Sequence, residues 1–256
     1  MSCRAHPLPA LMSEVFAVPS PTAPRAGHPP EWAALLARFY LRAGLQMPVM
    51  AQLQREEMPE PYRQLLVHSR DMTPTLETFH GHKLAITVLS REREQDAYLR
   101  EVLLRPAPDP ACAGETPAGA GRAPTLLPQQ LPLPGPEPNS KALPMPDFAA
   151  DRNVRAPVEY GVIRIFLDKL PPTARGAVLA EERPFGDILQ TEGIGHLSWP
   201  QAFFRIEADF RLGRVLGVRP AVSLYGRRNV LVDGSRRLLA EVIEVLPPAD
   251  HPEGRT

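Results

Sequence analysis

Clusters of proline divide this chain and limit where helices and strands can form. More than half of its 32 prolines fall within residues 1–29 and 106–155, which show no helical or strand period. Proline fixes its own φ angle and has no N–H to donate, so regular structure rarely continues through such clusters. We therefore predict a disordered leader at residues 1–29 and a disordered insertion at about 106–155. Residues 30–248 would form one domain that the insertion interrupts, followed by a tail at 249–256.

Charge and cysteine content argue against several classes of protein. Lys and Arg together number 29, as do Asp and Glu, so a formal net charge of zero gives no reason to expect nucleic acid or an anionic membrane as partner. Cys3 and Cys112 are too few for a disulfide framework or a cysteine metal site. No apolar run approaches the roughly 18 residues of a membrane helix, and the N-terminus is a poor secretory signal. We expect a cytoplasmic protein.

Helical periodicity comes first in the folded part of the sequence. Apolar residues recur at helical spacing in residues 30–44, 61–69 and 73–81. Pro30 would open the first of these helices and Gly44 would end it. In the third, Thr73 is expected as the N-cap, with Pro74 in the first turn. A later helix is predicted at about 173–182, followed by a short helical turn at 187–189.

Alternating apolar residues predict a set of strands. The alternation occupies residues 84–89, 97–105, 157–166, 204–210, 222–232 and 235–246. The charged run at 91–94 is expected to be a solvated turn, and Asp233-Gly234 predicts a type I′ hairpin. Neither side of the insertion has enough strands for a stable sheet, so strands from both sides should pair. The predicted fold class is α+β, with a mostly antiparallel β-sheet flanked by helices.

One predicted strand places a cation among apolar side chains. Arg100 shares its face of the strand at 97–105 with apolar residues, so it lies either at an edge or in a cavity that receives an anion. Arg227 and Arg228 begin a later strand, and Glu241 lies in the strand paired with it. An inward Arg opposite an inward Glu could be a buried salt bridge, but such pairs are costly to desolvate. A pocket for a small carboxylated ligand would use both groups.

Several segments resemble the chorismate lyase family, in the same order along the chain. They are residues 98–104 (YLREVLL), 183–189 (RPFGDIL), 224–228 (LYGRR) and 238–248 (LLAEVIEVLPP), with Met72-Thr73 as a further match. The resemblance spans about residues 60–248 apart from the insertion. It implies an antiparallel sheet flanked by helices, a buried site, and no metal or organic cofactor. The implied activity is elimination of pyruvate from chorismate to leave 4-hydroxybenzoate, for ubiquinone biosynthesis or another aromatic pathway.

The resemblance also implies roles for individual residues. Arg100 matches the arginine that binds the ring carboxylate of chorismate. Met72 and Phe185 match positions whose backbone lines the same site, and Phe185 stands where leucine is usual. Arg227 or Arg228 could bind the second carboxylate, although one or both could be structural.

The resemblance leaves two candidates for the carboxylate of the site. Glu241 matches the glutamate that contacts the oxygen at the far side of the ring, where it could carry a proton. The last hairpin is one residue shorter than usual in the family, which makes Glu244 a rival. Residues three apart on a strand face opposite sides of the sheet, so only one of the two can enter the site.

The main alternative is a module that binds a small carboxylate without catalysis. Effector domains of one large class of bacterial transcription regulators share the family's fold, but they follow a basic winged helix, whereas residues 1–60 here contain a single clear helix. Proline runs in the insertion favour polyproline II and could dock on a protein partner, with a plain linker as the preferred interpretation.

Overall fold

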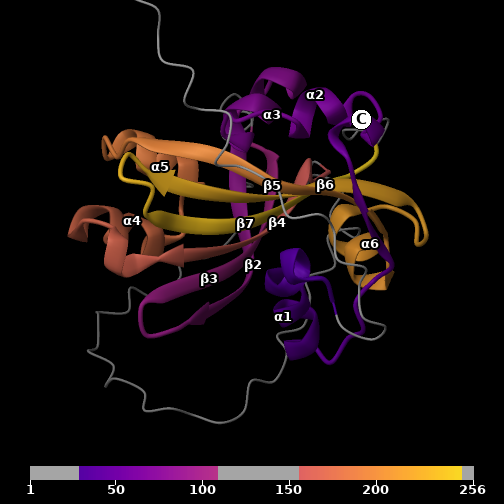
Figure 1. The fold of residues 1–256 in the computed structure, drawn as a ribbon, viewed down its shortest axis with the longest axis horizontal. Helices are drawn as coiled ribbons and strands as arrows, with labels where there is room; N and C mark the ends of the chain where they lie inside the picture. Colours follow the sequence, from indigo (N-terminus) through magenta and orange to yellow (C-terminus); the bar gives the residue numbers. More distant parts are fainter. Residues whose placement is uncertain (1–28, 109–155, 250–256) are drawn as a thin grey trace, which may run out of the picture.

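The computed structural model describes residues 29–108 and 156–249, and most of the predicted leader, of the insertion and of the tail lies outside the described residues. Within them, seven strands form one antiparallel sheet in the order β1-β5-β6-β7-β4-β3-β2 (Figure 1). The strands are β1 (Met50–Leu53), β2 (Leu84–Arg93), β3 (Ala97–Pro106), β4 (Glu159–Phe166), β5 (His196–Glu207), β6 (Ser223–Asp233) and β7 (Leu238–Leu246).

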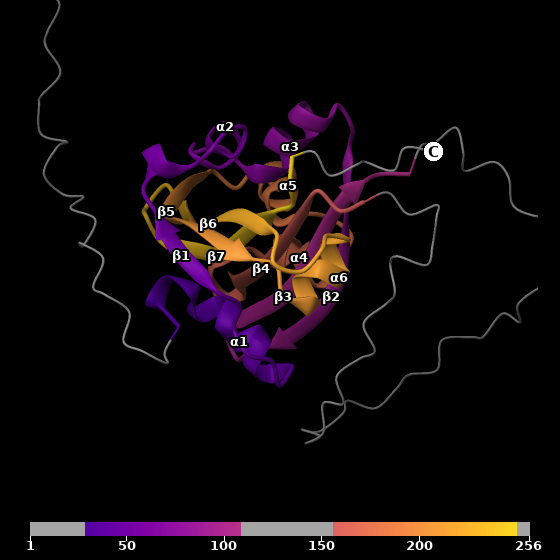
Figure 2. The same ribbon diagram turned by 90° about the vertical axis from the view of Figure 1, so that its right-hand side faces the viewer.

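Helices cover both faces of this sheet, which confirms the predicted fold class. They are α1 (Ala34–Arg42), α2 (Tyr62–Leu66), α3 (Met72–His80), α4 (Pro172–Ala180), α5 (Phe185–Thr191) and α6 (Phe210–Leu216). In Figures 1 and 2, α2 and α3 lie above the sheet and α1 lies below it. No helix within the described ranges combines the length and the apolar character needed to cross a membrane.

Strand alternation gives the two faces different partners. On one face, α1 and α6 pack on side chains such as Leu99 and Ile243. On the other, α4 and α5 pack on a cluster that includes Ile163 and Val242, while α2 and α3 pack on a cluster that includes Leu104. The second face therefore carries two apolar clusters side by side, and the space between them becomes important below.

The strands on either side of the insertion are direct neighbours, as predicted. β3 and β4 pair from Ala97 opposite Phe166 to Leu104 opposite Glu159. The pairing continues beyond β4, because the Val158 N–H donates to the Leu104 carbonyl at 2.9 Å. Both sides of the chain thus contribute to one sheet.

Two local predictions were wrong. The third helix begins at Met72 with Asp71 as N-cap, so Thr73 is already inside it. The charged run at 91–94 is not a turn, because β2 continues to Arg93. Counter-charges explain this difference: Glu92 forms ion pairs with Arg38 and Arg42, which α1 presents to the strand.

The final hairpin occurs where expected, but its turn is of another type. Asp233 ends β6, and its backbone N–H donates to the Arg237 carbonyl at 3.0 Å. Residues 234–236 between them form a three-residue loop. The αL conformation falls on Arg236, at φ 61°, rather than on Asp233 and Gly234. The Asp233 carboxylate accepts hydrogen bonds from the N–H groups of Ser235 and Arg237, both at 2.9 Å, which stabilises this loop in place of a type I′ turn.

The sequence analysis missed β1, α6 and the first half of β5. β1 is a four-residue edge strand, too short to show alternation. β5 contains Pro200, which the sheet accommodates at a register shift between Pro200 and Ala202. α6 does carry ordinary end signals, because Asp209 caps it through the Leu212 N–H at 2.8 Å and Gly217 follows in the αL conformation.

The insertion should be dispensable for folding. We expect that replacing residues 108–153 with a short Gly/Ser linker leaves the melting temperature nearly unchanged, because β3 and β4 already pair along their length. Thermal unfolding followed by circular dichroism measures this. A variant that fails to fold would mean that the replaced segment supplies part of the structure.

Candidate functional site

A cavity lies between the sheet and the starts of α3 and α5. Its walls come from β2, β3, β4, β6 and β7, and its cover comes from residues 71–73 and 184–186. It occupies the gap between the two apolar clusters of this face. The centres of water molecules can reach about 70 Å³ of it, where about 10–15 Å³ suffices for one water. An occupant is therefore a small molecule and not a peptide.

Strand register arranges the polar groups of the cavity in rows across the sheet. Arg100 and Asn229 share the first row, through Ile163 and Val242. Gly161 and Glu244 are paired in the second row, and Glu159 lies in the third, opposite Leu104. Successive rows are two residues apart along each strand, or about 7 Å. The cavity thus has a cationic end and an acidic end.

Arg100 brings a cation with free donors into this space. Its side chain is buried, with 1% of the residue exposed. Nη2 donates to the Arg183 carbonyl at 3.2 Å, whereas Nε and Nη1 have no partner among the residues that the structure describes. Burial lowers the pKa of Arg100 to about 10, which still leaves the guanidinium charged at neutral pH. Buried charges are normally paired, and no carboxylate within residues 29–108 and 156–249 is hydrogen-bonded to this one.

Glu159 and Glu244 form the acidic end. Glu244 is ion-paired with Nε of Arg227. Glu159 is buried, and its Oε2 has no hydrogen-bond partner within the described part of the chain. Burial, followed by the charge of Glu244, holds the pKa of Glu159 well above its usual range, against a smaller opposing effect of Arg227. These effects favour the neutral form of the Glu159 carboxyl.

Arg227 connects this acidic end to the cover of the cavity. It is fully buried. Beyond its ion pair, Nη1 donates to the carbonyls of Leu66 and His68 at 3.1 and 3.0 Å, and Nη2 donates to the Arg70 carbonyl at 3.3 Å. These bonds hold the segment between α2 and α3, which leads directly to Met72. With all of these partners, Arg227 positions the site and is not free to bind a second carboxylate.

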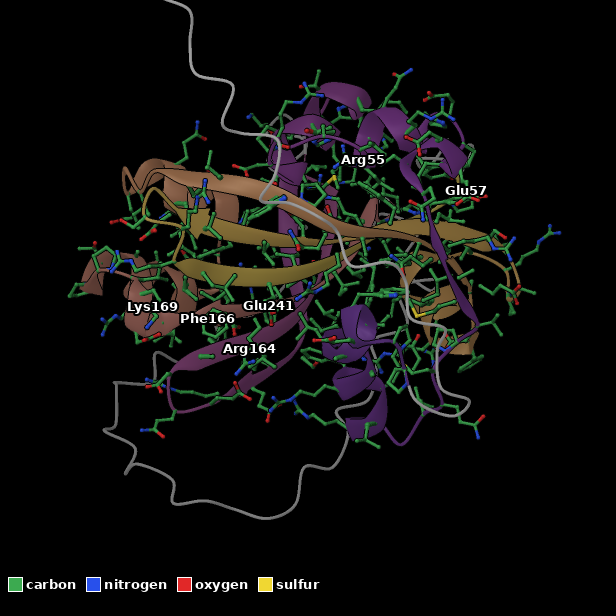
Figure 3. The ribbon with its side chains drawn as sticks, in the orientation of Figure 1. Arg55, Glu57, Arg164, Phe166, Lys169 and Glu241 are labelled. Atoms are coloured by element: carbon green, nitrogen blue, oxygen red, sulfur yellow. The ribbon has the colours of Figure 1, made fainter. Side chains whose placement is uncertain are left out.

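The structure brings together some of the residues expected at the site and separates others. Arg100, Met72 and Phe185 all line the cavity. Glu241 does not, because it lies on the opposite face and accepts a hydrogen bond from Arg228 at 3.0 Å. Figure 3 shows Glu241 beside Arg164, its partner across β4 and β7.

Strand alternation has the expected consequence for the rival carboxylate. Glu244 lines the cavity, and Glu241, three residues away, faces the other side. Glu241 and Arg228 were expected at the cavity, but both lie on the opposite face of the sheet. The functional roles of Arg100, Met72, Phe185 and Glu244 stay predictions.

Sequence reasoning missed two polar groups of the cavity. Glu159 shares a strand face with Gly161 and Ile163. A charged residue on the same strand face as a glycine and an apolar residue could have indicated a cavity in the sequence. Asn229 carried no comparable signal. It is buried, its Nδ2 donates to Ser198 Oγ at 2.9 Å, and its Oδ1 has no partner in the described ranges.

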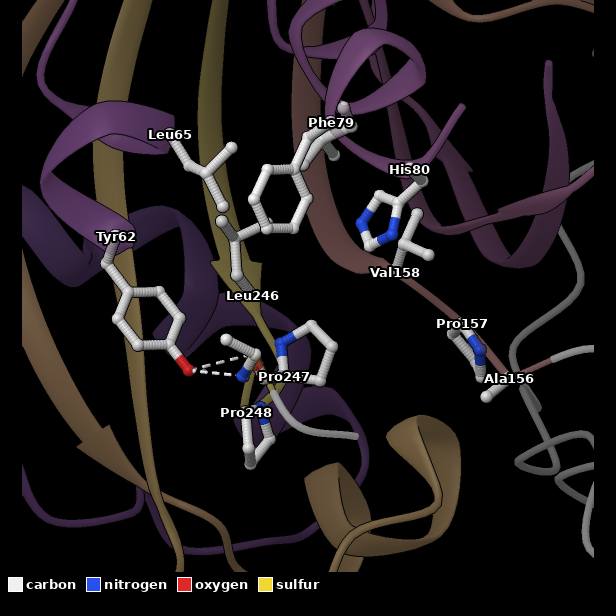
Figure 4. Close-up of a pocket in the computed structure, with 12 residues that line it drawn as sticks. Tyr62, Leu65, Phe79, His80, Ala156, Pro157, Val158, Leu246, Pro247 and Pro248 are labelled. Carbon is white, nitrogen blue, oxygen red and sulfur yellow. Dashed lines mark hydrogen bonds between the residues drawn. The ribbon is translucent and has the colours of Figure 1, made fainter. Parts of the chain in front are cut away.

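A second cavity lies between α2, α3 and the end of β7 (Figure 4). Most of its lining is apolar, including Leu65, Phe79 and Leu246. The Tyr62 hydroxyl at its edge already donates to the Pro247 carbonyl at 3.1 Å and accepts from the Ala249 N–H at 2.8 Å. Chemistry on a polar ligand therefore fits the first cavity better. Among the described residues, no group of three His, Cys, Asp or Glu side chains could hold a metal ion.

Comparisons with known proteins relate the chain to solved structures only. No protein-family model matches it. No curated protein matches it either. The effector domain of PhnF from Mycobacterium smegmatis is similar, with 9% identity, a TM-score of 0.41, and coverage of 70% of this chain and 90% of that one.

Two further solved structures are similar. The ligand-binding domain of a GntR-family transcriptional regulator from Bordetella bronchiseptica has 9% identity and a TM-score of 0.36, with 65% of this chain and 86% of that chain covered. PhnF from Mycobacterium smegmatis has 10% identity and a TM-score of 0.40, with 84% and 93% covered. Such values assign neither a family nor a function, so the proposal below rests on the cavity.

Replacing Glu159 with Gln should change how stability depends on pH. A raised pKa means that the folded protein keeps a proton that the unfolded chain releases above about pH 4.3, so wild-type stability falls as pH rises toward the folded pKa. Glu159→Gln lacks this loss, which amounts to up to about 1.4 kcal/mol per pH unit. The free energy of unfolding of the variant should therefore rise relative to that of the wild type as pH increases from about 4.3.

Urea unfolding over a series of pH values measures this difference in stability. Glu241→Gln, on the opposite face, is the matched control for loss of a carboxylate outside the cavity. Parallel stability curves for wild type and Glu159→Gln would show instead that Glu159 is charged in the fold.

Proposed function

We propose that this protein binds a small molecule through a carboxylate at Arg100. The observation that carries the proposal is a buried guanidinium whose Nε and Nη1 have no partner in the described part of the chain. A buried cation without a counter-ion is costly, and the residues lining the cavity offer it no hydrogen-bonded carboxylate. A carboxylate ligand would supply the missing charge.

The orientation of Arg100 suits such a ligand. The bond from Nη2 to the Arg183 carbonyl fixes the plane of the guanidinium. Nε and Nη1 each share one edge of the guanidinium with Nη2, which has a second N–H, and two parallel hydrogen bonds from one edge match the two oxygens of a carboxylate. Apolar side chains of Val102, Ile163 and Val242 line the space beyond them. The preferred ligand is therefore a small carboxylic acid with an apolar or aromatic body.

A second candidate function is chorismate lyase. It is favoured by one observation, namely that Arg100, Met72, Phe185 and a glutamate all line the same cavity. In this reaction the ring loses a proton from the carbon that carries the hydroxyl group, the carbon–oxygen bond of the ether on the neighbouring carbon breaks, and the departing enol takes up a proton to become pyruvate. Arg100 would hold the ring carboxylate, and Glu244 would carry the proton in place of Glu241.

Removing the charge of Arg100 should weaken binding and spare the fold. We expect Arg100→Met to reduce affinity for benzoate or 4-hydroxybenzoate by about 10- to 150-fold, the loss of a charge-assisted contact of about 1.5–3 kcal/mol. Its melting temperature without ligand should be unchanged or higher, because the variant removes an unpaired buried charge. Isothermal titration calorimetry and thermal unfolding measure the two effects.

Arg228→Ala is the control for this experiment, since it removes an arginine that faces away from the cavity. It should leave affinity unchanged. A large fall in the melting temperature of Arg100→Met, with no carboxylate bound by the wild type, would assign Arg100 a structural role and contradict the proposal.

The lyase candidate has its own test. Purified protein incubated with chorismate should release 4-hydroxybenzoate and pyruvate in equal amounts. Glu244→Gln should reduce turnover by about 100-fold or more if Glu244 carries the proton, whereas Glu241→Gln should be nearly silent. Absence of turnover in the wild type, combined with binding of 4-hydroxybenzoate, would reject the lyase and retain the binding module.

A further inference from the structure

Glu159 is a buried acid with one carboxyl oxygen left without a partner in the described part of the fold. Only 5% of the residue is exposed, and Oε2 has no hydrogen-bond partner among the described residues. An acidic group buried without a partner is costly and seldom retained for stability alone. Because Glu159 lines the same cavity as Arg100, the missing partner can belong to the bound molecule.

The charged groups around Glu159 favour its neutral form. Glu244, one row away on β7, is a carboxylate of the same sign when ionised. Arg227 is bound to Glu244 and to the backbone carbonyls of the segment before α3. Arg100 lies two rows away, and Asp71, at the cover of the cavity, is engaged with His196 at 2.9 Å. None of these groups is hydrogen-bonded to Glu159, and the charge of Arg227 only partly offsets the effects of burial and of Glu244.

We propose that the carboxyl group of Glu159 donates a hydrogen bond to an uncharged oxygen of the bound molecule. The site then selects a carboxylate that carries a second hydrogen-bond acceptor at its far end. This inference rests on the proposed function, because Arg100 supplies the contact to the carboxylate. It adds the chemical class of the ligand, a small monoanion with a carbonyl, hydroxyl or ether oxygen opposite its carboxylate.

The geometry sets the size of that ligand. Arg100 and the residue opposite Glu159 are four positions apart on β3, which is about 13 Å along the strand. The side chain of Glu159 shortens this gap. Glu159 folds back over Gly161, since its Oε1 would lie 3.4 Å from a Cβ added there. A single ring with substituents at opposite ends fits between the two groups.

Two test compounds of nearly the same shape separate the contributions. 4-Acetylbenzoate carries a ketone oxygen where 4-isopropylbenzoate carries a methyl group, and both present the same carboxylate to Arg100. At neutral pH, wild type and Glu159→Gln should each prefer the ketone by about two- to tenfold relative to Glu159→Leu, because a carboxylic acid and an amide both donate one hydrogen bond to it. Calorimetric titration measures the six affinities.

The outcomes distinguish this inference from the proposed function. Binding of both compounds with the same ratio in all three proteins would overturn the role of Glu159 and leave carboxylate binding at Arg100 intact. If neither compound bound the wild type, both the inference and the proposed function would be overturned. Infrared spectroscopy gives a measurement without ligand, because a protonated carboxyl has a carbonyl band that Glu159→Gln should lack. Absence of that band in the wild type at neutral pH would also overturn the inference.

Discussion

The buried ion pair between Arg227 and Glu244 couples the sheet to the segment that covers the cavity. The pair joins β6 to β7, and the same guanidinium donates to three carbonyls between α2 and α3. Loss of either partner would leave an uncompensated buried charge, which typically costs about 3–5 kcal/mol. The start of α3 and the acidic end of the cavity therefore depend on one interaction. Because Arg227 has these partners, Arg100 is the cation that remains for a ligand.

The two ends of the cavity differ in charge because some of its buried charged groups have a partner and others do not. Arg227 forms an ion pair with Glu244, whereas Glu159 has no ion pair in the described ranges, and burial raises its pKa and favours its neutral form. Arg100 lies at the other end with two donors that lack a partner in the described ranges. Between them the wall is apolar, which strengthens both electrostatic effects by excluding water. A cation at one end and a neutral acid at the other define an asymmetric ligand.

Much of this arrangement could be predicted from the sequence, and the parts that failed have physical reasons. Arg100 was identified because strand alternation placed it among apolar neighbours, and the pairing of β3 with β4 followed from the number of strands needed for a sheet. The choice between Glu241 and Glu244 depended on register, where a shift of one residue exchanges the two faces. Glu159 meets Glu244 only because β4 pairs with β7, a contact between residues far apart in the chain. No local pattern predicts such a contact.

A crystal structure with 4-bromobenzoate would test the central claim most directly, because the anomalous signal of bromine locates the ligand independently of its binding energy. The account predicts bromine inside the cavity, with the carboxylate within hydrogen-bonding distance of Nε or Nη1 of Arg100 and with the bond from Nη2 to the Arg183 carbonyl retained. A ligand bound elsewhere at full occupancy, with the cavity and Arg100 unchanged, would contradict it.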